Sequence, residues 1–363
     1  MIVSASNLFW GQGKKNGSSL QMRVLDPLHG HNWDRAVALH SEGNCFHTSA
    51  WAKVLHQTYK HQPFYLQFFH KRSLAALIPL MEIRSRFTGC RGVCLPFSDL
   101  CEPLIFESDV AESVRDQLLT FAQQRGWGHL EIRGGKSFPL ASVAAGRFYG
   151  HTLNLSRDCT QMFDRFTGSV RRAIRKAERS EVNAVAVEDR QAVSDFYELH
   201  VQTRRRHGLP PQPASFFFNI YEQIIKPGYG FTVLAKRGSR TIAAAIFFQS
   251  GKNALYKFGA SDKRFQEFRA NNLVMWRGIQ RLVGTGAEKL HFGRTDREDN
   301  GLRRFKLSWD TEEQAIDYFR VDPSGQQLSA SVRAESGFHK RIFGTLPLMF
   351  NRLAGSLVYP HLD

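Results

Sequence analysis

The chain has 363 residues and a formal net charge of +16, a length that predicts two domains or one large one. The excess of Lys and Arg favours a polyanionic partner, with a merely solvated basic surface as the alternative. The five cysteines are an odd number in a long chain, which argues against a disulfide framework, and no apolar run reaches the roughly 18 residues that span a bilayer. We therefore expect a cytoplasmic protein. We expect no metal site either, because Cys90, Cys94 and Cys101 are loosely spaced and have no nearby pair of histidines.

The first part of the chain predicts one α/β unit. Residues 1–20 are rich in Gly, Ser and Asn, which predicts disorder. Over residues 21–150, alternating and periodic apolar residues predict a first domain of two strands, a helix and a further strand. A short helix capped by Thr48 and Ser49 precedes them. These elements are expected at 64–69, 74–80, 109–124 and 129–133.

The second part repeats this order. A connector at 134–150 is followed by a second domain at 151–325, which opens with a basic helix. Its helices are expected at 161–180, 189–207, 214–225 and 272–283, and its strands at 231–236, 241–249, 253–259 and 288–293. The simplest interpretation is that the chain contains two copies of one α/β (α+β) unit. Each copy is expected to be a mixed, mostly antiparallel sheet flanked by helices.

Two basic helical segments are candidate phosphate-binding sites. Helical spacing places Arg171 and Arg175 on one face and Arg172 on a neighbouring face, together with Lys176 and Arg179. Like charges this close repel each other, so an anionic partner is expected, with a solvated face as the alternative. Arg204 stands in a second basic run that ends before three prolines. That run either forms one wall of a cleft or simply ends a helix favourably.

A third candidate lies where a predicted strand leads into a helix. Tyr256 belongs to the strand, and Asn271 and Asn272 open the helix that follows. The free N–H groups and dipole of a helix N-terminus favour an anion, although both asparagines also suit simple helix capping. Tyr256 is a candidate for handling a proton.

The run from Phe292 to Asp296, followed by a basic turn from Gly301 to Lys306, is the most informative motif. Arg294 and Asp296 come where a strand becomes a loop, which is a common ligand position in α/β sheets. Asp296 is a candidate for moving a proton, and Lys306 ends the basic turn.

Together with the run from Arg171 to Ala177, this motif resembles the FemAB-like proteins of the GNAT superfamily over roughly residues 45–320. The resemblance implies tandem GNAT-like domains and the transfer of an acyl or aminoacyl group from an acyl-CoA or an aminoacyl-tRNA to an amine. It also implies a Lys near the reacting centre, here Lys306, as a candidate for stabilising an oxyanion, with a surface salt bridge as the alternative. The chain departs from the GNAT pattern between Asp262 and Asn271, where the glycine-rich loop is missing. That departure puts ordinary CoA binding in question, and FemAB-type transferases that use aminoacyl-tRNA depart here too.

The implied acceptor is a phosphorylated or lipid-linked amine of a cell-envelope or polysaccharide precursor, and tRNA is a further expected partner. Two rival hypotheses remain open: a nucleic-acid-binding protein that uses the basic helix, and a non-catalytic scaffold of GNAT-like domains. The apolar and basic tail at 326–363 is expected either to pack on the first domain or to bring the protein to the inner face of the membrane.

Overall fold

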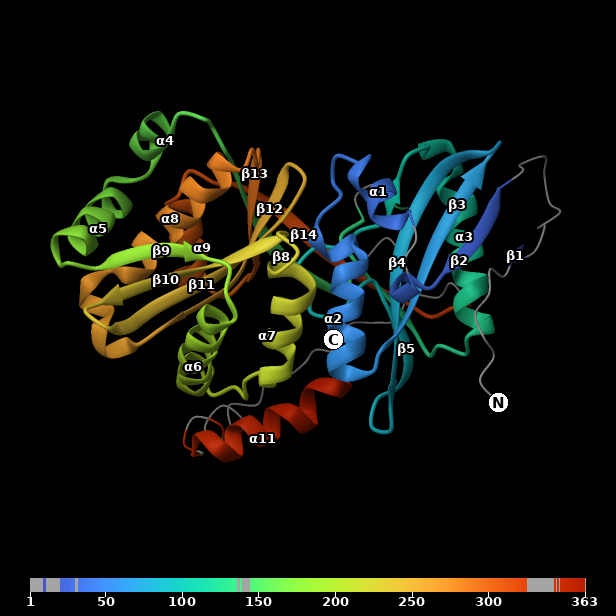
Figure 1. Cartoon of the computed structure of the whole chain (residues 1–363). Coiled ribbons are helices and arrows are strands. Elements are labelled where there is room, and N and C mark those ends of the chain that lie inside the picture. The colour runs from blue at the N-terminus through green and yellow to red at the C-terminus, as the bar shows by residue number, and fades with distance from the viewer. Residues whose placement is uncertain are drawn as a thin grey trace. The chain divides into compact units, whose positions relative to one another are not determined.

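A computed structural model describes residues 9–10, 20–29, 32–135, 138, 144–324, 343, 345 and 347–362. The chain forms two compact units (Figure 1). Unit 1 contains Met1–Phe148, Ile316–Val332 and Pro360–Asp363, and unit 2 contains Tyr149–Ala315 and Arg333–Tyr359. Of the segment expected to be disordered, Phe9–Trp10 form strand β1, and residues 1–8 and 11–19 lie outside the described residues. In the described part of the chain, no helix is both long and apolar enough to cross a membrane.

Unit 1 is built on a mostly antiparallel set of strands. Strands β1 to β5 pair antiparallel in sequence order, β6 pairs with β4, and β5 pairs with β7 in parallel. The strands are β2 (Gln21–Leu25), β3 (Gln62–His70), β4 (Ser73–Ser85), β5 (Gly89–Val93), β6 (Leu104–Ile105) and β7 (Leu130–Arg133). The helices are α1 (Trp33–Ala38), α2 (Ser49–Tyr59) and α3 (Ala111–Gln124), with 3-10 turns at Pro27–His29, Cys45–His47 and Ser108–Val110.

Unit 2 has the same arrangement of pairs. Its strands are β9 (Asn183–Val187), β10 (Gly230–Arg237), β11 (Arg240–Ser250), β12 (Asn253–Ser261) and β13 (Lys289–Asp296). Its helices are α4 (Cys159–Arg165), α5 (Gly168–Arg179), α6 (Arg190–Arg206), α7 (Ala214–Ile220), α8 (Ala270–Gly284), α9 (Asn300–Leu307) and α11 (Leu348–Val358). A π-helical turn, Tyr221–Ile225, extends α7, and 3-10 turns form at Lys263–Phe268 and Tyr359–His361.

The order of strand pairs supports the predicted internal repeat. The three antiparallel pairs from β2 to β5 in unit 1 and from β9 to β12 in unit 2 are each followed by one parallel pair, and a helix connects the two parallel strands. That helix is α3 in unit 1 and α8 in unit 2. Strands β8 (Gly146–Asn154) and β14 (Glu312–Val321) each have residues in both units. In unit 1, β14 pairs antiparallel with β7 from Tyr318 to Val321.

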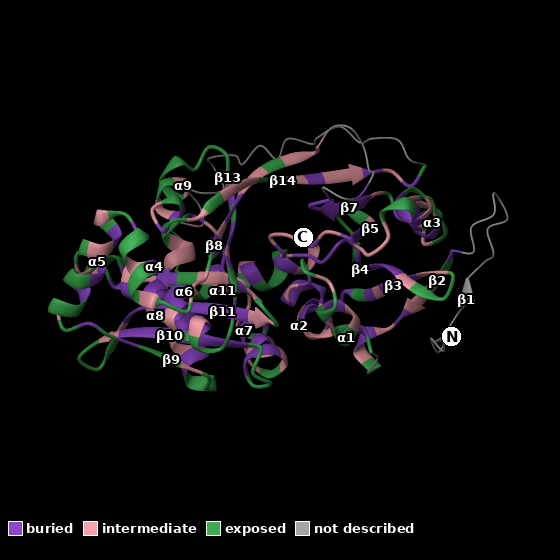
Figure 2. Ribbon diagram, turned by 90° about the horizontal axis from the view of Figure 1, so that it is seen from above, coloured by how far each residue is buried: buried purple, intermediate pink, exposed green. Residues whose placement is uncertain are grey.

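Burial explains which segments become strands in unit 2. The central strands β10 and β11 are buried almost throughout (purple in Figure 2) because helices cover both of their faces. On one side Phe247 packs with the residues of α8, and on the other Phe258 packs against Phe196 and Phe217 of α6 and α7. The continuous apolar runs that predicted these strands reflect burial on both faces.

Several predicted boundaries are corrected. The single helix expected at 161–180 is two helices, because the buried Phe166 breaks the run between α4 and α5. The connector expected at 134–150 includes the first half of β8, and β13 extends through Asp296 rather than ending before Arg294. The basic turn after Gly301 is helix α9, whose N-cap Asp299 accepts a hydrogen bond from the Leu302 amide.

The tail does not pack on the first domain as one piece. Helix α11 packs against α6, where the Arg352 guanidinium pairs with Glu198 and an added Cβ on Gly355 would overlap the Pro211 carbonyl. The residues after it belong to unit 1, where Arg91 donates to the His361 carbonyl. The part of the predicted tail at 325–342 lies outside the described residues.

Candidate active site

Strands β12 and β13 separate after a short paired stretch. They pair in parallel only from Asn253 to Leu255 with Lys289 to His291. Both strands continue for several more residues without pairing with each other, although all of these residues are described. A β-bulge in the β11–β12 ladder, between Phe258 and Tyr256, increases the local twist of β12 at the same point. The strands of unit 2 therefore part toward their C-terminal ends, a common ligand position in α/β sheets.

The corresponding opening in unit 1 is filled by the chain itself. Strands β5 and β7 pair only from Gly92 to Val93 with Leu130 to Glu131. The segment after β5 then returns along β7: the Cys94 amide donates to the Glu131 carbonyl, and Cys101 forms an antiparallel bridge with Arg133. Both cysteines are fully buried. The repeat thus leaves unit 2 as the unit that can hold a ligand between its parallel strands.

A pocket of about 170 Å³ lies where β12 ends and α8 begins. Ser261 and Asp262 line it from β12 and the turn that follows, Asn271 and Asn272 from the first turn of α8, and Phe305 from α9. Helix α8 begins at Ala270, after Arg269 in the left-handed conformation (φ 57°), so Asn271 and Asn272 stand inside the helix rather than capping it. The pocket therefore lies at the N-terminal end of α8, where the helix dipole favours an anionic ligand, although the Asn272 amide donates to the Arg269 carbonyl.

Asp262 organises the turn that replaces a glycine-rich loop. Its buried carboxylate accepts hydrogen bonds from the Arg264 amide and guanidinium and from the Arg240 guanidinium. The hydrogen bond from Arg264 lowers the pKa of Asp262, so the carboxylate stays charged and paired. Because the carboxylate is neutralised, the exposed guanidinium groups of this turn leave the rim of the pocket basic.

Lys306 is buried at the far end of β13. Its ammonium donates to the carbonyls of Gly293, at 2.9 Å, and Arg294, at 3.0 Å. Gly293 has a φ of +73°, a conformation that favours glycine, so the ammonium fixes a bend in the strand. Lys306 thus holds the backbone that carries Arg294 and Asp296, whereas the sequence suggested a side chain near the reacting group.

A partly buried network lies next to Lys306. Arg303 binds both oxygens of Glu313 at 2.7 Å, and His151 Nε2 lies 3.0 Å from the same carboxylate. The Arg303 hydrogen bonds lower the pKa of Glu313, and burial, aided by the Lys306 charge, lowers the pKa of His151. At neutral pH the network therefore contains a charged carboxylate, a charged guanidinium and a neutral imidazole.

Tyr256 is placed to donate a proton rather than to accept one. Its ring packs between Phe247 and Phe292, and its hydroxyl lies over Gly259, where an added Cβ would overlap it. Burial raises the pKa of Tyr256 to about 12. The hydroxyl is therefore protonated at neutral pH and points along the part of β12 that has separated from β13.

The predicted substrate-binding arginines and Asp296 lie outside the lining of this pocket. Arg294 and Asp296 are exposed on one side of β13. On α5, Arg172 and Arg175 are exposed, whereas Arg171 is partly buried and pairs with Asp164 at 3.6 Å. Arg204 donates to the Tyr359 hydroxyl and the Pro210 carbonyl, so it holds the segment after α11 rather than lining the pocket.

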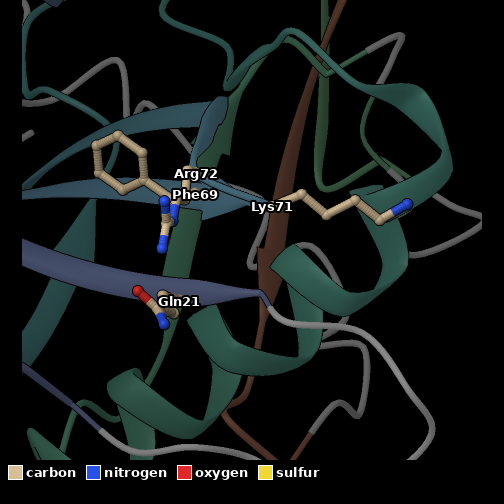
Figure 3. A pocket seen from close by; sticks show the side chains of 4 residues that line it. All are labelled: Gln21, Phe69, Lys71 and Arg72. Atoms are coloured by element: carbon tan, nitrogen blue, oxygen red, sulfur yellow. The ribbon is translucent and has the colours of Figure 1, made fainter.

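A second hollow lies in unit 1, at the hairpin between β3 and β4. It has a volume of about 280 Å³ and is lined by Gln21, Phe69, Lys71 and Arg72. Figure 3 shows Arg72 directed toward Gln21 and Lys71 extending away from it. This hollow brings together no pair of groups suited to acid–base chemistry, so the candidate active site stays in unit 2.

Comparisons with known proteins agree with this location. Residues 164–307 match the family model of the acetyltransferase (GNAT) domain. This part of the chain is a GNAT domain. It begins in α4 and ends in α9, so it includes β12, α8 and β13. The prediction of a GNAT-type acyltransferase is therefore confirmed at the level of the domain family.

The fold of the whole chain is similar to that of FemX. The crystal structure of FemX superposes with a TM-score of 0.66 and 14% identity, over 81% of this chain and 96% of FemX. A tandem GNAT protein from the clavulanic acid biosynthesis pathway superposes with a TM-score of 0.53 and 8% identity, over 84% of this chain and 99% of that protein. A search of curated protein sequences gave no match. The expected FemAB-like fold of tandem GNAT units is confirmed.

The sequence interpretation missed the groups that support β13 from the side. His151 on β8 lies 162 residues before Glu313 on β14, whereas Arg303 on α9 lies only 10 residues before it. Their contact depends on strand pairing that no local pattern specifies. The pairing of Asp262 with Arg264 had a local signal, since an acidic residue two positions before an arginine at a helix start is a common capping arrangement.

Proposed function

We propose that the chain is an N-acyltransferase that moves an acyl or aminoacyl group from an activated, phosphate-bearing donor to an amine. The donor is an acyl-CoA thioester or an aminoacyl-tRNA ester, and the two share a reactive carbonyl and an anionic carrier. The observation that carries the proposal is the separation of β12 and β13 beside the N-terminus of α8. Such an opening accommodates an extended acyl carrier between the strands and its phosphates at the helix.

The reaction joins the amine nitrogen to the acyl carbon and breaks the bond from that carbon to sulfur or oxygen. The amine loses one proton and the leaving group gains one. In our proposal the Tyr256 hydroxyl, which keeps its proton at neutral pH, supplies the proton to the leaving group. The exposed carboxylate of Asp296 accepts the proton from the attacking amine, and Arg294 beside it helps to hold the acceptor. Lys306 keeps both of them in place through the backbone.

The turn before α8 bears on the class of donor. No glycine stands between Asp262 and Asn271, so side chains surround the first amides of α8 more closely than a glycine-rich loop does. Arg269 lines the pocket, and Arg240 and Arg264 together carry one positive charge more than the Asp262 carboxylate with which they pair, so the site as a whole is basic. Both donor types carry phosphates that such a site attracts.

The acceptor is proposed to be an amine on a phosphorylated or lipid-linked precursor of the cell envelope or of a polysaccharide. The support for this part is the charge of α5, where Arg172 and Arg175 are exposed. Exposed guanidinium groups recognise phosphate through paired hydrogen bonds.

The proposal is tested by incubating the protein with acetyl-CoA, longer acyl-CoAs or aminoacyl-tRNA in the presence of amine acceptors. Release of free thiol or of deacylated tRNA, together with an amide product, is the expected result. Tyr256→Phe should slow this release without preventing donor binding, because it removes only the hydroxyl. Affinity for plain duplex or RNA that falls steeply with salt, with no product from any donor, would instead identify a nucleic-acid-binding protein.

A further inference from the structure

Helix α11 presents an apolar face to solvent. The exposed side chains on it are large: Met349 is 70% exposed and Leu357 is 64% exposed, and Phe350, Leu353 and Val358 are exposed as well. At about 100° per residue, positions 349, 350, 353 and 357 fall within one sector about 100° wide. The opposite face is buried, with Asn351 donating to the Phe343 carbonyl and Gly355 against Pro211. The helix is therefore fixed by its polar and small residues and leaves its apolar residues outside.

This face is not required for the fold of unit 2. Helix α11 is held to α6 by the pair of Arg352 with Glu198 and by the close approach of Gly355 to Pro211. The Tyr359 hydroxyl fixes the end of the helix through the Pro210 carbonyl and the Arg204 guanidinium. The apolar residues take no part in these contacts, so their presence calls for an occupant.

We propose that the apolar face of α11 inserts into the surface of an anionic lipid membrane. Charge favours this occupant: residues 336–362 contain Lys340 and Arg341, besides the Arg352 that pairs with Glu198, and no acidic residue, in a chain of net charge +16. Amphipathic helices with apolar residues on one side and cations beside them lie in the interface between lipid and water.

The size of the face argues against a second copy of the chain. An 11-residue helix is about 16 Å long, and its exposed apolar surface is on the order of a few hundred Å². A stable protein interface buries about 800 Å² on each partner. A membrane needs no such area, because partial insertion combined with charge attraction is enough for reversible binding.

The proposal does not rest on acyl transfer and is tested without a donor or acceptor. Full-length protein is sedimented with vesicles of phosphatidylcholine alone and with vesicles that are one-third phosphatidylglycerol. We expect binding to the anionic vesicles that weakens as salt is raised. Leu353→Glu combined with Leu357→Glu should reduce this binding by about tenfold or more. Both side chains are exposed, so this variant should keep its melting temperature.

The matched control is Tyr229→Glu, which adds charge at another exposed large side chain of unit 2. It should bind the vesicles as the parent protein does. Equal loss of binding in the control, or equal binding by the Leu353 and Leu357 variant, would overturn the proposal. A shift from dimer to monomer caused by the double variant in the absence of lipid would also overturn it, because a second copy would then be the occupant. The proposal would also be contradicted if residues 325–342 cover the face. In that case α11 would be protected from proteolysis in the full chain, and removing residues 325–342 would abolish this protection.

Discussion

Replacing Lys306 with Met tests whether this lysine acts on the backbone or on the reacting group. Methionine has a similar length and volume, so packing should change little and the main loss is the ammonium. That ammonium donates two hydrogen bonds to buried carbonyls, at 2.9 and 3.0 Å. A hydrogen bond with a charged partner contributes about 1.5–3 kcal/mol, and removing the cost of burying the charge offsets part of this. We therefore expect Lys306→Met to lower the free energy of unfolding by about 2–4 kcal/mol.

Urea unfolding measures this loss, with Lys289→Met as the control. Lys289 is exposed at the start of the same strand, and its replacement should change stability by no more than about 0.5 kcal/mol. The unchanged slope of the transition would show that the same amount of surface is exposed on unfolding. A loss below about 0.5 kcal/mol in Lys306→Met, with turnover reduced about 10²-fold or more, would refute the backbone role and place the ammonium at the oxyanion.

Three further changes test separate parts of the account. Replacing Arg172 and Arg175 together with Ala should weaken acceptor binding by roughly 1–3 kcal/mol for each charged hydrogen bond that is lost. Titration calorimetry measures the affinity for the acceptor, and an unchanged affinity would show that these arginines only form a solvated surface. His200 is buried, and burial lowers its pKa to about 3, so its contribution to stability is complete above pH 6.5 and is lost as the pH falls toward 3. Between pH 7 and pH 5 this loss should be about 2 kcal/mol, and His200→Gln should remove it from the pH dependence of unfolding; an unchanged pH dependence would contradict the assignment. Gly355→Ala places a Cβ against the Pro211 carbonyl and should destabilise α11 by about 1–3 kcal/mol, seen as faster proteolytic cleavage within the helix, whereas unchanged cleavage would show that α11 is not tightly docked.

Local patterns in the sequence were enough to predict the core of unit 2. Strands β10, β11 and β12 are continuous apolar runs between turns, and α6 and α8 have helical periodicity with clear ends. Because the repeat of elements could also be seen in the sequence, the tandem arrangement was predictable. Strands β8 and β14 could not be predicted in the same way, because they are polar or of mixed character and are defined by partners far away in the chain.

The residues of the candidate site were also predictable from the sequence only in part. Tyr256, Asn271 and Asn272 lie on consecutive elements, so their proximity to one opening followed from the order of strand and helix. The role of Lys306 could not be inferred, because its burial depends on how α9 folds back on β13. Arg204 looked like a binding residue because it stands in a basic run, and its partner Tyr359 comes from the other end of the chain.

The central claim is that the phosphates of an acyl donor bind at the N-terminus of α8, and Asn271→Asp tests it most directly. Asn271 is exposed and lines the pocket. A carboxylate in the first turn stabilises a helix through its dipole but repels a bound phosphate. Gln161→Glu, at an exposed position in the first turn of α4, adds the same charge away from the pocket and serves as the control.

The measurement is the rise in melting temperature that acyl-CoA or aminoacyl-tRNA produces in the parent protein and in these variants. At about 100 times the dissociation constant, a donor adds about 2.7 kcal/mol of stability, which for a unit of this size is a rise of about 5–10 °C. We predict this rise with at least one of the two donors in the parent protein and in Gln161→Glu. In Asn271→Asp we predict its loss, without any fall in the melting temperature of the free protein. A full rise in Asn271→Asp would contradict the claim, as would no rise with either donor in the parent protein.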